Sequence, residues 1–110
     1  MAGDVVLGYD GSEGSQAALA VAVTVARAFD ATLAVVFGYE PSPVGGEVAD
    51  YRRQLEKLGA DVVAKAVQQA SQLDADVTVD AVVVPMRPVE SLLAAADERA
   101  ARVIVVGGTG

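Results

Sequence analysis

The 110-residue chain contains no cysteine, no histidine and no tryptophan, and only 5% of its residues are aromatic. Without cysteine the chain forms no disulfide and offers no thiolate to a metal. Without histidine and cysteine, neither a Ser-His nor a Cys-His nucleophile arrangement can be built from its own residues. These absences exclude the commonest hydrolase mechanisms and leave the redox character of the compartment open.

Basic residues are also scarce. Eight Lys and Arg stand against 15 Asp and Glu, which gives a formal net charge of −7. This balance disfavours nucleic acid and anionic membrane surfaces as partners, because both are bound through concentrated positive charge. The longest apolar stretch, residues 17–26, is too short to cross a bilayer, and residues 1–4 carry none of the basic residues of a secretion signal. We therefore expect a cytoplasmic protein.

Hydrophobic residues make up 53% of the chain, enough for one domain over residues 1–110. Their periodicity predicts strands and helices in strict alternation. The expected strands are 4–9, 32–37, 76–84 and 102–106, and the expected helices are 15–29, 47–73 and 89–101. Such alternation is typical of an α/β domain with a parallel sheet, right-handed crossovers and helices on its faces.

The most specific residues lie in two segments, VVLGYDGSEGSQAAL at 5–19 and VVVPMRPVESLLAAADERAARVIVVGGTG at 82–110. Together they resemble the universal stress protein family. The resemblance implies a Rossmann-like fold of the adenine nucleotide alpha hydrolase-like kind, with a parallel sheet in the order 3-2-1-4-5. The last helix and strand of that fold would come after Gly110, so we expect a single domain that is incomplete at its C-terminal end. Members commonly form dimers, which implies a homodimer.

A glycine motif follows the fourth expected strand. One subset of the family binds ATP and carries G-x2-G-x9-G-(S/T) there, and Gly107 and Gly110 match its first two glycines. Glycines at this place let backbone amides approach a phosphate closely. Thr109 could donate its hydroxyl to a phosphate or simply solvate a turn. The resemblance thus implies ATP as the cofactor, together with Mg²⁺.

Asp10 follows the first expected strand. In the family, the acidic residue at this place lies beside the nucleotide, so the resemblance makes Asp10 a candidate Mg²⁺ ligand. From the residues alone, an Asx turn that holds Gly11 and Ser12 is the alternative, with Ser12 as a helix N-cap. The backbone of Gly8 and Tyr9 would line the adenine or ribose, unless these residues form an ordinary strand end.

Further candidates follow the second and third expected strands. The resemblance implies a backbone contact of Phe37 and Gly38 with adenine, and Gly38 stands where a Val-like residue is common, which predicts a roomier floor. Core packing is the alternative for Phe37. Met86 could approach the base from the side or pack, and Arg87 could face a phosphate or remain a solvated loop side chain.

Three functions stay open at this stage. The first is an ATP-binding regulatory module in a stress response. The second is a slow Mg²⁺-dependent ATPase, although the sequence supplies neither an evident base nor an arginine finger, so no catalytic residue is assigned. The third is a nucleotide-free dimerisation or chaperone-like interaction module. Gly107 and Gly110 favour the first function over the third.

Overall fold

The computed structural model of the chain describes residues 3–40 and 48–107. Strands and helices alternate, as predicted, and all strand pairs are parallel. In chain order the elements are β1 (Val5–Gly8), α1 (Glu13–Phe29), β2 (Leu33–Gly38), α2 (Val48–Leu73), β3 (Val79–Val84), α3 (Pro88–Glu98) and β4 (Val103–Val105). The sheet order is β3-β2-β1-β4, which confirms the predicted order 3-2-1-4.

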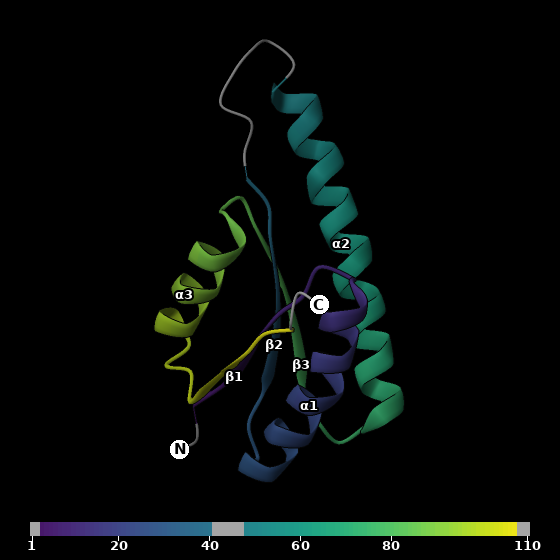
Figure 1. Ribbon diagram of the computed structural model, residues 1–110, viewed down its shortest axis with the longest axis vertical. Coiled ribbons are helices and arrows are strands. Elements are labelled where there is room, and N and C mark those ends of the chain that lie inside the picture. Colours follow the sequence, from purple (N-terminus) through teal and green to yellow (C-terminus); the bar gives the residue numbers. More distant parts are fainter. Residues whose placement is uncertain (1–2, 41–47, 108–110) are drawn as a thin grey trace.

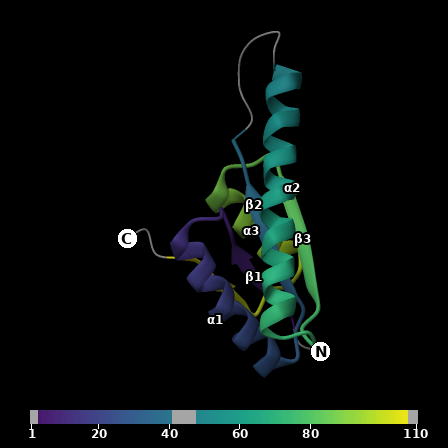
Figure 2. The same ribbon diagram turned by 90° about the vertical axis from the view of Figure 1, so that its right-hand side faces the viewer.

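Helices cover both faces of the sheet (Figure 1). Helices α1 and α2 lie on one face, which Figure 2 shows from the front, and α3 lies on the other. Because side chains alternate along a strand, Val5 and Leu7 of β1 pack in the core under α1 and α2, whereas Val6 packs with Ala95 of α3. Burial on both faces explains why β1 and β2 are continuous apolar runs.

Several element ends differ from the prediction because of local turns. The strand expected from residue 76 begins at Val79, since the Asp76 amide donates to the Asp74 carboxylate at 3.0 Å in a turn. Helix α3 ends at Glu98 rather than at 101, because Ala100 adopts a left-handed conformation with φ of 51°.

None of the helices in the described residues is long and apolar enough to cross a membrane.

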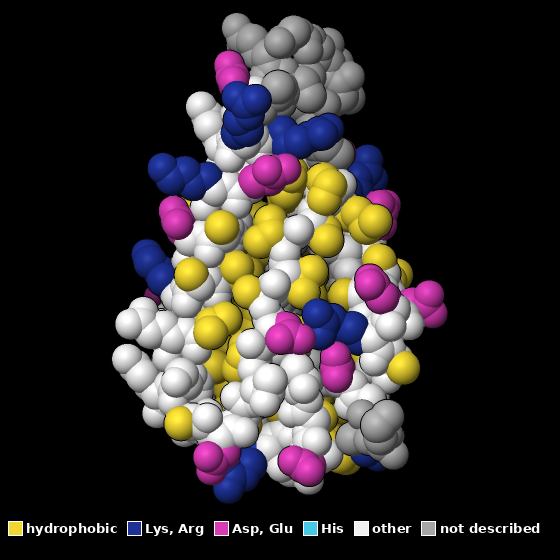
Figure 3. Space-filling view, turned by 180° about the vertical axis from the view of Figure 1, so that it is seen from behind, with side chains coloured by type: hydrophobic (Ala, Val, Ile, Leu, Met, Phe, Trp, Pro, Cys, Tyr) yellow, Lys and Arg dark blue, Asp and Glu magenta, His cyan; other side chains and the backbone are white. Residues whose placement is uncertain are grey.

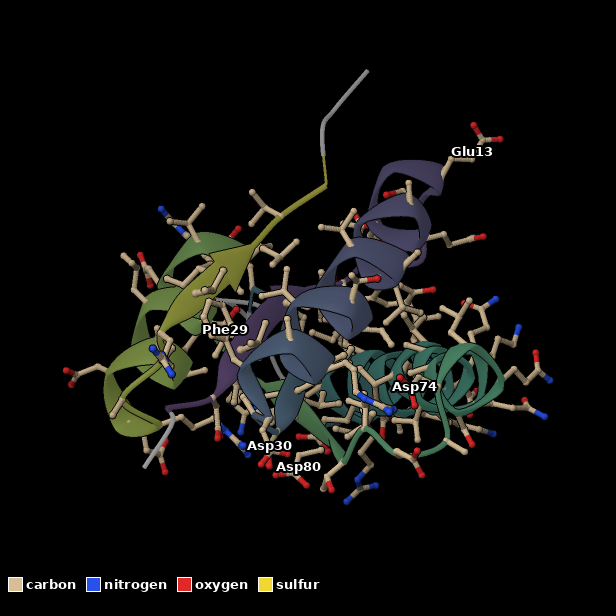
Figure 4. All side chains as sticks on the ribbon, turned by 90° about the horizontal axis from the view of Figure 1, so that it is seen from below. Glu13, Phe29, Asp30, Asp74 and Asp80 are labelled. Atoms are coloured by element: carbon tan, nitrogen blue, oxygen red, sulfur yellow. The ribbon has the colours of Figure 1, made fainter. Side chains whose placement is uncertain are left out.

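Ion pairs connect different helices, strands and loops at the end of the molecule where the strands begin. Arg99, at the end of α3, donates to Asp4 and to Asp80, each at 3.0 Å. Arg27 of α1 reaches Asp74 at 2.8 Å. Figure 4 looks at this end from below and labels Asp74 and Asp80. These contacts join residues far apart in the sequence and leave the opposite end, where the strands finish, free for a site.

Candidate functional site

A cleft of about 440 Å³ opens where β1 and β2 end, between α3 and the loop that leads into α1. Its lining comes from the ends of three strands, the β1–α1 loop and the first turns of α1 and α3. The lining residues are Gly8, Tyr9, Asp10, Ser12, Ser15, Val36, Gly38, Pro88, Val89, Ser91, Leu92, Val106 and Gly107. The carboxyl ends of parallel strands, at the point where the strand order reverses, are the usual ligand site of α/β sheets.

The structure brings together five of the residues singled out from the sequence. Gly8, Tyr9, Asp10, Gly38 and Gly107 all line the cleft. They belong to three strand ends that are adjacent in the sheet, although up to 99 positions separate them in the sequence.

Phe37 and Met86 do not line the cleft. The Phe37 side chain packs against the core under α1 and α2, because alternation along β2 turns it to the face opposite Val36. The core-packing alternative therefore describes this side chain. Met86 is 42% exposed. Thr109 and Gly110 lie outside the described residues.

Asp10 forms the Asx turn that its spacing predicted. Its Oδ1 accepts a hydrogen bond from the Ser12 amide at 2.9 Å. Hydrogen bonding from the Ser12 side chain, followed by that from the Ser12 backbone, lowers the pKa of the Asp10 carboxyl below its usual value of 3.8. The cleft therefore presents an ionised carboxylate in a fixed position.

Gly11 and Ser12 precede α1, and Ser12 caps its first turn together with Ser15. Gly11 supplies the left-handed conformation with φ of 86°. The Ser12 hydroxyl accepts from the Ser15 amide at 3.2 Å, which confirms Ser12 as the N-cap, and the buried Ser15 hydroxyl donates to the Ser12 carbonyl at 3.0 Å. Both hydroxyls thus serve the helix start and hold this wall of the cleft rigid.

The two glycines at the ends of β1 and β2 let α3 pack closely on the sheet. A Cβ built on Gly8 would fall 2.9 Å from a methyl carbon of Leu92, and one on Gly38 would fall 2.8 Å from the Met86 carbonyl oxygen and against Ser91. The roomier floor expected at Gly38 is therefore absent, because α3 fills that space. The sequence did not point to the α3 residues Val89, Ser91 and Leu92 of the cleft. The signal that could have indicated a closely packed helix was the glycine at the end of each of two neighbouring strands.

Tyr9, the residue after β1, lines the cleft, but its side chain packs on the face of the sheet that α1 and α2 cover. Its hydroxyl donates to Oε1 of Gln69 in α2 at 3.4 Å, and the residue is only 5% exposed. Burial, followed by the negative charge of Asp10, raises the pKa of Tyr9 above 10.0. The phenol is therefore a neutral packing group rather than a ligand contact.

Asp10 is the single acidic residue that lines the cleft in the described part of the chain. Glu13, three residues later, points outward from the body (Figure 4). Among the described residues no three acidic, histidine or cysteine side chains gather as a metal cage. Mg²⁺ commonly takes one or two protein carboxylates and completes its shell with water and phosphate oxygens, so Asp10 fits the role of a single carboxylate ligand.

Residues 1–110 match the universal stress protein family. A Thermus aquaticus relative, described as "Universal stress protein in QAH/OAS sulfhydrylase 3'region", is 36% identical over 113 residues, covering 96% of this chain and 77% of the relative. The solved structure of Mycobacterium tuberculosis H37Rv protein Rv1636 is 29% identical with a TM-score of 0.72, over 100% of this chain and 75% of that one.

Two further structures with this fold were solved with adenine nucleotides. A universal stress protein in complex with cAMP is 25% identical with a TM-score of 0.71, over 94% of this chain and 71% of that one. An Archaeoglobus fulgidus universal stress protein in complex with dAMP is 20% identical with a TM-score of 0.66, over 96% of this chain and 80% of that one. The match over the whole chain and the 36% identical relative lead to one conclusion: this chain belongs to the universal stress protein family.

Proposed function

We propose that this domain binds an adenine nucleotide, ATP with Mg²⁺, in the cleft and acts as a regulatory module in a stress response. The observation that carries the proposal is the meeting of Asp10 with Gly8, Gly38 and Gly107 in one cleft. The cAMP and dAMP complexes of structures with the same fold support an adenine nucleotide as the ligand class.

The two ends of the cleft differ in polarity, which gives the ligand an orientation. Val36, Pro88 and Leu92 make the end near β2 and α3 apolar, and the Ser91 hydroxyl there already donates to the Pro88 carbonyl. Asp10 and Gly107 lie at the other end, beside the start of α1. The base fits the apolar end, and the sugar and phosphates fit the end with Asp10 and Gly107.

Bound Mg²⁺ would neutralise phosphate charge beside the Asp10 carboxylate. Asp10 would supply a carboxylate ligand to Mg²⁺, and the Ser12 amide would hold that carboxylate in place. Gly107, with Gly110 and Thr109, is the proposed phosphate contact, because backbone amides can come close where no Cβ intervenes.

Binding is favoured over hydrolysis as the main activity. Of the described residues that line the cleft, Asp10 alone is charged, and it is the proposed Mg²⁺ ligand, so no described lining residue is left to act as a general base on the attacking water. Slow Mg²⁺-dependent hydrolysis remains the second activity to measure. Calorimetric titration of the chain with ATP, with and without Mg²⁺, tests the proposal, and phosphate release over hours reveals any hydrolysis.

Asp10→Ala should weaken ATP binding mainly when Mg²⁺ is present. An equal loss in EDTA would contradict the metal role of Asp10, and no heat with millimolar ATP or AMP would contradict the nucleotide site. That last result would favour the interaction module instead.

The proposal includes a homodimer in the cytoplasm. The dimer is supported by exposed apolar side chains on the α3 side of the molecule that do not line the cleft: Leu93 and Ile104 are 59% and 43% exposed. Such a patch is typical of a surface that is covered in an assembly. Light scattering after size exclusion measures the mass, and a monomer at micromolar concentration would contradict the dimer.

A further inference from the structure

An ion pair stands at the rim of the apolar end of the cleft. Nε of Arg87 donates to Oε1 of Glu40 at 3.2 Å. Arg87 immediately precedes Pro88 and Val89, which line the cleft, and Glu40 follows two residues after Gly38, which also lines it. The pair therefore bridges the two loops that border this end.

The bond between Arg87 and Glu40 is weak enough to adjust to a ligand. Their side chains are 65% and 63% exposed, and a single contact between exposed charges contributes little to stability. The contact through Nε fixes one edge of the guanidinium. The flat faces of the group are not used by this bond, and such faces stack well on planar rings.

Several basic side chains lie at this end of the molecule, interspersed with Glu40, Asp50 and Glu56. Figure 3 shows several Lys and Arg side chains gathered toward the upper end, where the strands finish. Arg52, Arg53 and Lys57 are exposed on the part of α2 that extends past the strands, and Arg87 starts α3. In the described part of the chain no Lys or Arg lines the cleft itself, so a protein cation that contacts the ligand would have to come from the rim.

We propose that Arg87, held by Glu40, stacks its guanidinium on the base of the bound nucleotide and so strengthens binding of the base. This inference rests on the proposed nucleotide site and names a residue that contacts the base. A guanidinium over an aromatic ring gains from the quadrupole of the ring and from contact between two flat groups.

The position of Glu40 argues against a phosphate as the target of Arg87. The Glu40 carboxylate lies 3.2 Å from Nε and would repel a phosphate brought to the same guanidinium. The charges of the pair balance, so the pair attracts a polyanion weakly, yet the ring face of the guanidinium keeps its stacking capacity. The surrounding wall of Val36, Pro88 and Leu92 is also apolar, which suits a base.

The test compares adenosine with ATP in calorimetric titrations of the full chain. For adenosine, which carries no phosphate, Arg87→Gln should weaken binding by about two- to fivefold and Arg87→Lys by a smaller factor, because lysine keeps the charge but lacks the flat group. Glu40→Gln should weaken adenosine by a smaller factor, because it releases the orientation of Arg87 but leaves the guanidinium in place. Arg53→Gln is the matched control, because Arg53 also forms an exposed ion pair, with Asp50 at 3.7 Å, and should leave both affinities unchanged.

A direct readout is the Nε–Hε resonance of Arg87, which should move upfield when adenosine binds, because the ring current of the base acts on it. Full affinity in Arg87→Lys, with a loss in Arg87→Gln that grows with the number of phosphates, would overturn stacking and assign Arg87 to the phosphates. Unchanged affinity in both Arg87 variants would also overturn it. If the unaltered chain binds neither adenosine nor ATP, the proposed nucleotide site itself is wrong and this inference falls with it.

Discussion

Gly107, two residues beyond the end of β4, lies directly against Gly14 in the first turn of α1. A Cβ built on Gly107 would fall 2.7 Å from the Ser15 amide nitrogen and still nearer the Gly14 carbonyl carbon. Strand β4 pairs with β1, so the chain leaving β4 passes the start of the helix that follows β1. The contact places a glycine backbone beside Asp10 at the end of the cleft where the phosphates are proposed to lie.

Gly107→Ala should lower the free energy of unfolding by about 1–3 kcal/mol, because the new methyl meets backbone atoms that cannot rotate away. Gly8→Ala is the matched control. Its methyl would meet the tip of the Leu92 side chain at 2.9 Å, which can change rotamer, so we expect a smaller loss. Urea unfolding of both variants measures the difference, and equal losses would show that the Gly107 contact relaxes.

Asp10→Asn should separate the turn from the charge. Asparagine can accept the same bond from the Ser12 amide, whereas Asp10→Ala loses it and should cost about 0.5–1.5 kcal/mol at pH 7. The lowered pKa of Asp10 means that its charge stabilises the fold above pH 3.8 and that this stability is lost as the pH falls through the folded-state pKa. The stability gap between wild type and Asp10→Asn should therefore close in acid. A gap that stays constant down to pH 2 would contradict the assignment.

Tyr39→Phe should remove the bond from the buried Tyr39 hydroxyl to Oε1 of Glu56 at 3.0 Å, at a cost of about 1 kcal/mol. Burial, followed by the bond to Glu56, raises the pKa of Tyr39 above 10.0. The neutral phenol therefore stabilises the fold below pH 10, and this contribution is lost as the pH rises through the folded-state pKa.

Unfolding curves between pH 8 and 11 should show the wild-type advantage over Tyr39→Phe shrinking above pH 10. Tyr51→Phe, at a position 48% exposed on α2, the helix that carries Glu56, should change the free energy of unfolding by less than about 0.5 kcal/mol. A wild-type advantage in the free energy of unfolding that grows with pH would contradict the raised pKa of Tyr39.

Ala100→Gly should stabilise the protein by about 0.5–1 kcal/mol. Ala100 adopts φ of 51° at the end of α3, where its Cβ is strained and glycine is not. Ala94→Gly, at an exposed position inside α3, should destabilise by about 1 kcal/mol, because glycine is a poor helix former. Thermal unfolding of the two variants should shift in opposite directions, and a destabilised Ala100→Gly would refute the strain.

The order of the elements follows from patterns within each segment, whereas their exact ends do not. The apolar run of β1 and the turn residues after it were enough to place a buried strand before Asp10. The early end of α3 depends on the backbone of Ala100, where no glycine signals a left-handed turn. Likewise, the late start of β3 depends on the turn at Asp74, whose carboxylate also binds Arg27 of another helix.

The candidate site was only partly predictable for the same kind of reason. Asp10, Gly38 and Gly107 could be grouped because parallel strands end at one edge of a sheet. The Phe37 side chain could not be assigned to the core without knowing which face of β2 carries α1 and α2. Ser91 and Leu92 could not be found without knowing that their helix packs on Gly8 and Gly38.

By itself, the sequence determined the alternation of strands and helices, the Asx turn at Asp10 and the Ser12 cap, because hydrogen bonding and periodicity over a few residues decide them. Only the tertiary structure decided which side chains share the cleft, what fills the space at Gly38, and that Arg87 meets Glu40 at its rim. Those features depend on distances between residues remote in the chain, and such distances exist only once the two faces of the sheet are covered.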